Sequence, residues 1–160
     1  MRRFGSEPPG QGHPSPLTVL SPDLAAGALP TEFPCDGANR RPRLQWSTPP
    51  SGTPELAVEM LDPDAPGGTF THWLVYGIPP GISSMAGRAD RRRARRQRLR
   101  PARLWRPAPP RGAAHHYHLV VLALDTRLGL AAGARRSDLE SRISGHVLAR
   151  GELVAIYQRA

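Results

Sequence analysis

Two clusters of acidic and imidazole side chains carry the chemistry that this sequence could perform. The first is the turn Asp62-Pro63-Asp64-Ala65-Pro66, where each proline fixes its own φ and restricts the preceding residue, so the carboxylates are held at little entropic cost. His72 follows at the start of an apolar segment, and His115-His116-Tyr117-His118 forms the second cluster. Imidazoles and a phenol can donate hydrogen bonds to a phosphate or a carboxylate, and an Asp–His pair can also exchange protons.

Each cluster also has a purely structural interpretation. An Asp in a turn commonly caps backbone amides, and a single His at the start of a strand is usually a hydrogen-bonded core residue. On a strand, His115 and Tyr117 face one side while His116 and His118 face the other, so either His pair suggests zinc. We expect no metal, because Cys35 is the only thiol and no third ligand follows at a recognised spacing. A covalent nucleophile is not expected either, since the sequence has no Gly-x-Ser-x-Gly turn and no base beside the cysteine.

The segments that must position these clusters are typical of short strands separated by turns. Apolar, β-branched and aromatic residues predict strands over residues 17–20, 43–46, 55–61, 71–78, 116–124 and 152–157. Ser137-Asp138-Leu139-Glu140 has the pattern of a capping box and predicts a helix that runs to about Ala149. Its expected buried stripe consists of Leu139, Ile143, Val147 and Leu148. The pattern favours a mainly β, mostly antiparallel domain with minor α in the form of one or two C-terminal helices.

Composition separates one basic block from an otherwise balanced chain. The 160 residues include 22 basic ones, all of them Arg, against 13 acidic ones. Residues 88–111 alone hold 11 Arg and one Asp, so the rest of the chain has 11 Arg against 12 acidic residues. We expect a disordered Pro/Gly-rich tail over residues 1–16. One domain over residues 17–160 should follow, interrupted by an arginine-rich loop at 88–106 that forms coil or a loose helix.

Several protein classes are not expected from this composition. No apolar run reaches the roughly 18 residues of a transmembrane helix, and the N-terminal segment lacks the apolar stretch of about 7–15 residues that a signal peptide needs. One cysteine cannot form an internal disulfide. We therefore expect a cytoplasmic protein without a cofactor.

Taken in order, the motifs resemble the phosphatidylethanolamine-binding protein family, and specifically its bacterial, Raf kinase inhibitor-like branch. The resemblance covers about residues 17–87 and 107–160. The motifs that carry it are Cys35-Asp36-Gly37, Leu44-Gln45-Trp46-Ser47, the Asp62–Pro66 turn, His72-Trp73, Pro109-Pro110, His115-x-Tyr117, Gly145-His146-Val147-Leu148-Ala149 and Glu152-Leu153.

This resemblance implies a β-sandwich-type domain with a small anion-binding pocket. The implied lining residues are Asp62, Pro66, His72, His115 and Tyr117, which should converge in space. Asp64, Ala65 and Pro110 are expected to support the turn. The implied ligand is a phosphate, a carboxylate or a phospholipid head group.

The arginine block departs from the family pattern. The branch has there a stretch like Gly-x-Asn-Asp-Phe-Gly-x-x-Gly-Tyr-x-Gly-Pro, which forms one pocket wall, whereas residues 96–107 of this chain are dominated by Arg. One choice of codons for residues 96–107, read one base later, gives Gly-Asn-Asp-Phe-Gly-Arg-Pro-Gly-Tyr-Gly-Gly-Pro. We therefore hypothesise a local frameshift over about residues 88–107, which the nucleotide sequence of the gene tests.

Three function classes follow from these observations. The expected one is a binding or regulatory protein, not an enzyme, with the anion pocket described above and a regulated protein partner. The first alternative is a non-specific binder of nucleic acid or another polyanion through residues 88–106. The second is a hydrolase-type enzyme that uses His72 and Asp62 as an acid–base pair. The sequence leaves open the natural ligand, the partner and whether the chain forms a homodimer.

Overall fold

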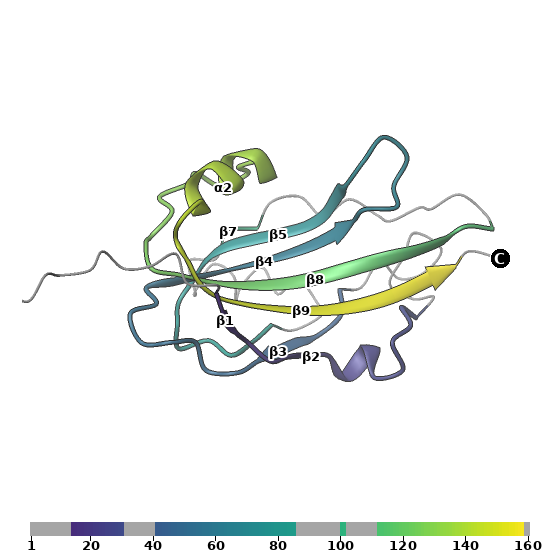
Figure 1. Ribbon diagram of the computed structural model, residues 1–160, viewed down its shortest axis with the longest axis horizontal. Coiled ribbons are helices and arrows are strands. Elements are labelled where there is room, and N and C mark those ends of the chain that lie inside the picture. Colours follow the sequence, from purple (N-terminus) through teal and green to yellow (C-terminus); the bar gives the residue numbers. More distant parts are fainter. Residues whose placement is uncertain (1–13, 31–40, 86–99, 102–111, 159–160) are drawn as a thin grey trace, which may run out of the picture.

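The computed structural model describes residues 14–30, 41–85, 100–101 and 112–158, which form two sheets and a helix (Figure 1). A six-stranded sheet has the order β1-β9-β8-β4-β5-β7, and a three-stranded sheet has the order β2-β3-β6. The elements in chain order are β1 (Ser15–Pro16), β2 (Val19–Leu20), the 3-10 helix η1 (Pro22–Leu24), β3 (Leu44–Trp46), β4 (Glu55–Asp62), β5 (Phe70–Ile78), β6 (Ser84–Met85), β7 (Arg100–Pro101), β8 (Ala114–Leu124), α2 (Arg136–Ile143) and β9 (Val147–Gln158).

Pairing is antiparallel throughout these sheets except between β1 and β9, which run parallel. β8 and β9 form a long hairpin whose register extends from Ala114 opposite Gln158 to Leu124 opposite Val147. The predicted fold class, mainly β with minor α, is therefore confirmed.

Apolar residues fill both faces of the larger sheet. The inner face, toward the three-stranded sheet, contributes Val58 and Leu119 to a core that also includes Leu44 and Trp46 of β3. The outer face packs against α2, where Leu139 is fully buried. Figure 1 shows α2 on one side of the larger sheet and β2 and β3 on the other. Both faces of β8 are covered over the second half of the strand, which explains why its sequence is almost continuously apolar there.

The helix begins with a different cap from the predicted one. The Asp138 carboxylate accepts the backbone N–H of Arg135 at 2.7 Å, so the helix begins at Arg136. The Ser and Glu of the predicted capping box therefore do not cap it. An acidic side chain in the first turn satisfies a free backbone donor and also complements the helix dipole, which is what this Asp does.

The predicted end of the helix at Ala149 is also wrong. Gly145 adopts a φ of 77°, which lets the N–H of His146 reach the carbonyl of Ile143 at 2.9 Å and closes the helix there. Val147 and the following residues form β9, which therefore begins well before the predicted position at Glu152. Continued pairing with β8 supplies a hydrogen-bond ladder that a helix through a glycine would not match.

Two short strands lie where regular structure was not expected. Ser15–Pro16, the last two residues of the predicted tail, pair with β9. Arg100–Pro101 lie in the arginine block and pair with Val75 and Tyr76 at the edge of β5. Edge pairing needs only backbone donors and acceptors, so a segment with few apolar side chains can still form it. The rest of the block and residues 1–13 lie outside the described residues. No helix in the described ranges is long and apolar enough to span a membrane.

The buried carboxylate of Glu59 on β4 forms a hydrogen bond that connects α2 to the outer face of the larger sheet. Glu59 is 5% exposed, and its carboxylate accepts a hydrogen bond from Nε of Arg136 at 3.3 Å. Burial raises the pKa of Glu59, and the nearby Arg136 opposes this rise without cancelling it. The folded protein therefore binds the carboxyl proton of Glu59 more strongly than the unfolded chain does. As the pH rises above the ordinary pKa of a carboxyl group, ionisation of Glu59 lowers the stability of the fold.

We expect Glu59→Gln to gain stability relative to the natural protein as the pH rises from about 4 to about 8, since Gln cannot ionise. Urea unfolding at several pH values measures this difference. Glu140→Gln is the matched control, because Glu140 also pairs with Arg136 but is half-exposed. A difference in unfolding free energy that stays constant over this pH range would contradict the prediction.

Candidate functional site

The end of β4 lies between the starts of β8 and β5, because β4 is antiparallel to both of its neighbours. Asp62 is the last residue of β4, and the Asp62–Pro66 turn then leads to β5. This arrangement brings together residues as far apart in the sequence as Asp62 and His115, which are 53 positions apart.

One buried carboxylate oxygen lies close to two imidazole rings. Oδ2 of Asp62 lies 2.7 Å from Nδ1 of His115 and 3.5 Å from Nε2 of His72. Asp62 and His115 are each 2% exposed, and His72 is 5% exposed. A carboxylate so deeply buried is stable only when hydrogen-bonded or paired, and the imidazoles supply that pairing.

Aromatic rings complete the surroundings of His72. The ring of Tyr117, which is fully buried, meets the His72 ring edge-on with the centroids 5.4 Å apart. The Phe70 ring lies on His72 with its centroid at 4.7 Å. We call Asp62, His72, His115 and Tyr117 the buried His–Asp cluster.

A β-bulge explains how His72 reaches the inner face. The register passes from Met60 opposite Trp73 to Leu61 opposite Thr71, so His72 is the extra residue of the bulge. Strict alternation would place His72 and Trp73 on opposite faces, whereas the bulge lets both side chains join the inner side. This irregularity has no signal in the sequence.

The Asp62–Pro66 turn is tied to β8 through Asp64. The Asp64 N–H donates to Oδ1 of Asp62 at 3.0 Å, and Oδ2 of Asp64 lies 2.8 Å from the N–H and 2.7 Å from Nδ1 of His116. These hydrogen bonds from His116 hold the pKa of Asp64 below its usual value. The carbonyl of Ala65 accepts the N–H of Gly68 at 3.1 Å, which closes the turn.

Pro66 does not belong to the buried His–Asp cluster. It is exposed and lies in the turn between β4 and β5, and its place in a pocket lining stays a prediction. Pro110 lies outside the described residues.

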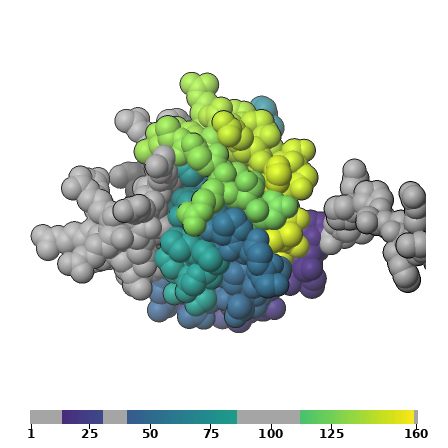
Figure 2. Space-filling view, turned by 90° about the vertical axis from the view of Figure 1, so that its left-hand side faces the viewer, coloured from purple at the N-terminus to yellow at the C-terminus, as the bar shows by residue number. Residues whose placement is uncertain are grey.

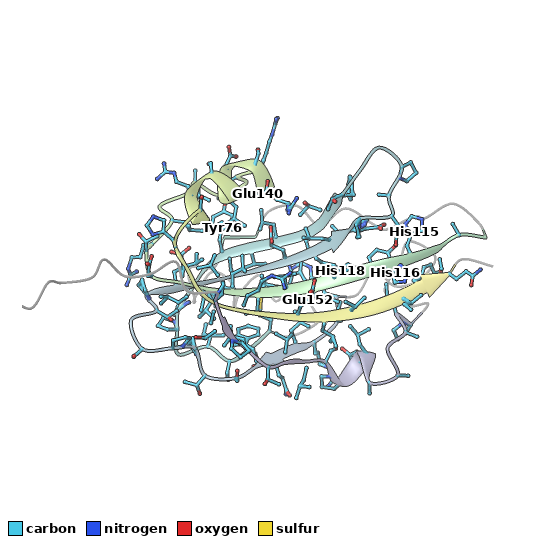
Figure 3. The ribbon with its side chains drawn as sticks, viewed as in Figure 1. Tyr76, His115, His116, His118, Glu140 and Glu152 are labelled. Carbon is cyan, nitrogen blue, oxygen red and sulfur yellow. The ribbon has the colours of Figure 1, made fainter. Side chains whose placement is uncertain are left out.

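The two outward-facing histidines of β8 pair with carboxylates. Nδ1 of His118 lies 2.7 Å from Oε1 of Glu152 on β9. Nδ1 of His116 lies 2.7 Å from Oδ2 of Asp64. Figure 3 shows His115, His116 and His118 in order along β8, with Glu152 beside His118. In the described part of the chain, no group of three or more His, Cys, Asp or Glu side chains could hold a metal ion.

A cavity of about 360 Å³ lies at the other end of the strands, lined in part by Glu55, Gly77 and Arg127. The Glu55 carboxylate accepts the N–H groups of Gly77 at 2.8 Å and Leu128 at 3.2 Å, so it holds backbone segments together. Figure 2 shows the molecule from this end. The surface of the residues that follow β8 (green) lies above the surface of earlier residues (teal and blue). This cavity is separate from the buried His–Asp cluster, since Glu55 and Asp62 stand at opposite ends of β4.

The fold and the cluster define a two-sheet β domain whose larger sheet ends in a buried carboxylate shared by two imidazoles. A sequence model of the family described as phosphatidylethanolamine-binding protein matches residues 21–158, and the chain belongs to this family. The resemblance of the sequence to this family is thereby confirmed.

Individual relatives span most of the chain. It is 37% identical over 148 residues to a UPF0098 protein of Pyrococcus horikoshii, which covers 82% of this chain and 71% of the relative. A crystal structure of a phosphatidylethanolamine-binding protein homologue from Chlamydia trachomatis superimposes with a TM-score of 0.80 at 26% identity, covering 91% of this chain and 99% of that one. The structure of YbcL from Escherichia coli gives a TM-score of 0.78 at 26% identity and covers 91% of this chain and all of YbcL (100%).

Proposed function

We propose that this protein binds a small anion, a phosphate or a carboxylate group, at the buried His–Asp cluster. The observation that carries the proposal is the single oxygen of Asp62 facing both His115 and His72. A carboxylate in that position orients the imidazoles, and a protonated imidazole is a donor at each ring nitrogen.

Proton uptake is part of the proposed binding step. When neutral His115 donates its Nδ1 proton to Asp62, its Nε2 carries a lone pair that repels an anion. Protonation turns Nε2 into a charged donor, and hydrogen bonds to charged groups are the stronger ones. Binding should therefore strengthen as the pH falls from about 8 to about 6, the range in which an imidazole ordinarily gains its proton.

Membership of the family supports binding as the role, and we propose that occupancy of the site regulates a protein partner. The same His72 and Asp62 could instead transfer a proton during hydrolysis, so a turnover assay accompanies the binding measurement. Release of phosphate from phosphoethanolamine at a rate set by His72 would favour the hydrolase alternative.

Sulfate is the sharpest first probe, because it has the shape of phosphate and keeps its double charge over this pH range. We expect sulfate to shift the ring proton signals of His72 and His115, with an affinity that rises toward pH 6. His72→Ala should weaken binding about tenfold, because it removes one hydrogen bond to a charged group.

His146→Ala is the matched control for this titration. His146 is also paired with a carboxylate, Asp125, at 2.7 Å, but it is exposed and follows α2 in the chain. Its removal should leave sulfate affinity unchanged. Equal losses from both substitutions, or ring signals that ignore sulfate, phosphate and acetate alike, would count against the site.

A further inference from the structure

Arg41 places a positive charge over an aromatic ring of the larger sheet. It lies just before β3 of the smaller sheet, and its guanidinium carbon is 5.6 Å from the centroid of the Trp73 ring on β5 of the larger sheet. Trp73 is fully buried, so the guanidinium is stacked on a ring inside the fold.

No carboxylate of the described residues forms an ion pair with Arg41. Arg43, two positions along, differs in this respect because its guanidinium binds Asp23 at 2.6 Å. Burial lowers the pKa of Arg41, and the nearby groups of the described structure do not offset that burial. A half-buried cation without a counter-ion is costly, and an anionic ligand would supply the missing charge.

Trp73 links Arg41 to the buried His–Asp cluster. The bulge in β5 puts His72 and Trp73 on the same inner face, where Trp73 joins the core that contains Tyr117. The indole N–H of Trp73 is buried and makes no hydrogen bond to another described residue. The inner face that carries His72 therefore also carries a ring with a cation over it and an indole donor that has no acceptor among the described residues.

We propose that Arg41 is a specificity-determining residue of the anion site, which binds phosphate oxygens and selects a phosphate group over a carboxylate group. This inference rests on the function proposed above. A phosphate has oxygens left over after it has met the imidazoles, and the planar guanidinium fork fits two of them. A carboxylate that meets the two imidazoles has used both of its oxygens. Because a guanidinium stays charged, Arg41 also supports binding at pH 8, where ordinary imidazoles are neutral.

The test compares Arg41→Met with Arg43→Met, which removes the same charge from the same segment. Affinities for inorganic phosphate, phosphoethanolamine and acetate are measured at pH 6 and pH 8 by calorimetry. We expect Arg41→Met to weaken phosphate about tenfold, with the larger loss at pH 8, and to change acetate much less. Arg43→Met should leave all three affinities close to those of the natural protein.

The outcomes separate this inference from the function on which it rests. If the natural protein binds none of the three anions, both are overturned. If it binds phosphate and Arg41→Met binds it equally well, or loses acetate to the same extent, Arg41 has no selective role and the anion site stands. Tighter binding of phosphoethanolamine than of inorganic phosphate would identify a lipid head group as the source of the phosphate. Tighter binding of inorganic phosphate would identify a free phosphate. In both cases, weaker binding of the preferred ligand by Arg41→Met supports the proposal.

A second variant protects the test against misfolding. Arg41→Lys keeps the charge but lacks the fork, so we expect it to lose part of the preference for phosphate and to retain binding at pH 8. A Lys variant with the full preference of the natural protein would overturn the selective role of the guanidinium. Thermal unfolding of each variant shows that the comparison is made on folded protein.

Discussion

His115→Phe is expected to lower the free energy of unfolding by about 3 kcal/mol at neutral pH, because it removes one partner of a buried pair. The loss should fall at the lower end of the range for broken buried pairs, since His72 remains 3.5 Å from the same oxygen of Asp62. Phenylalanine fills a similar volume, so the effect reports the lost charge partner more than a cavity. Anion binding should weaken more than tenfold, because a charged donor is also lost.

Urea unfolding of His115→Phe at pH 7, alone and combined with Asp62→Asn, checks the cause. Adding Asp62→Asn to this variant should restore most of the stability while leaving anion binding weak. An unfolding free energy equal to that of the natural protein at pH 7 would mean that Asp62 does not depend on this imidazole.

Strands were the part of the fold that the sequence predicted best. β4, β5 and β8 were each expected within two residues of their observed bounds, because long apolar or alternating segments have few other ways to bury their side chains. The helix was predicted over too long a range. There the apolar spacing after Ile143 matched both a helix and a strand, and pairing with β8 decided between them.

The members of the candidate site came from a resemblance, and their geometry came only from the structure. The bulge at His72 depends on how β5 pairs with β4, which no local pattern specifies. Arg41 was missed because the chain has 22 basic residues, and nothing in their spacing distinguishes the one stacked on Trp73. What sets Arg41 apart is its burial and its lack of a carboxylate partner in the described structure, and both depend on how the two sheets pack.

The packing of the two sheets depends in turn on a close backbone contact at Gly151 of β9. A Cβ atom built there would lie 2.5 Å from the carbonyl oxygen of Leu17 and 2.5 Å from a methyl carbon of Val19. The Leu17 N–H also donates to the Arg150 carbonyl at 2.9 Å, so this segment cannot move away without losing a hydrogen bond. We expect Gly151→Ala to lower the free energy of unfolding by about 2–3 kcal/mol.

The effect of Gly151→Ala should reach the candidate site, because Val19 pairs with Trp46 of β3 and β3 follows the segment that carries Arg41. Displacing β2 therefore shifts the smaller sheet over the inner face, and phosphate affinity should fall along with the unfolding midpoint. Gly81→Ala is the control, since a Cβ there meets nothing within 4 Å and the backbone suits any residue. If Gly151→Ala loses stability but keeps full phosphate affinity, the site is held by the larger sheet alone, and Arg41 does not depend on how the smaller sheet is seated.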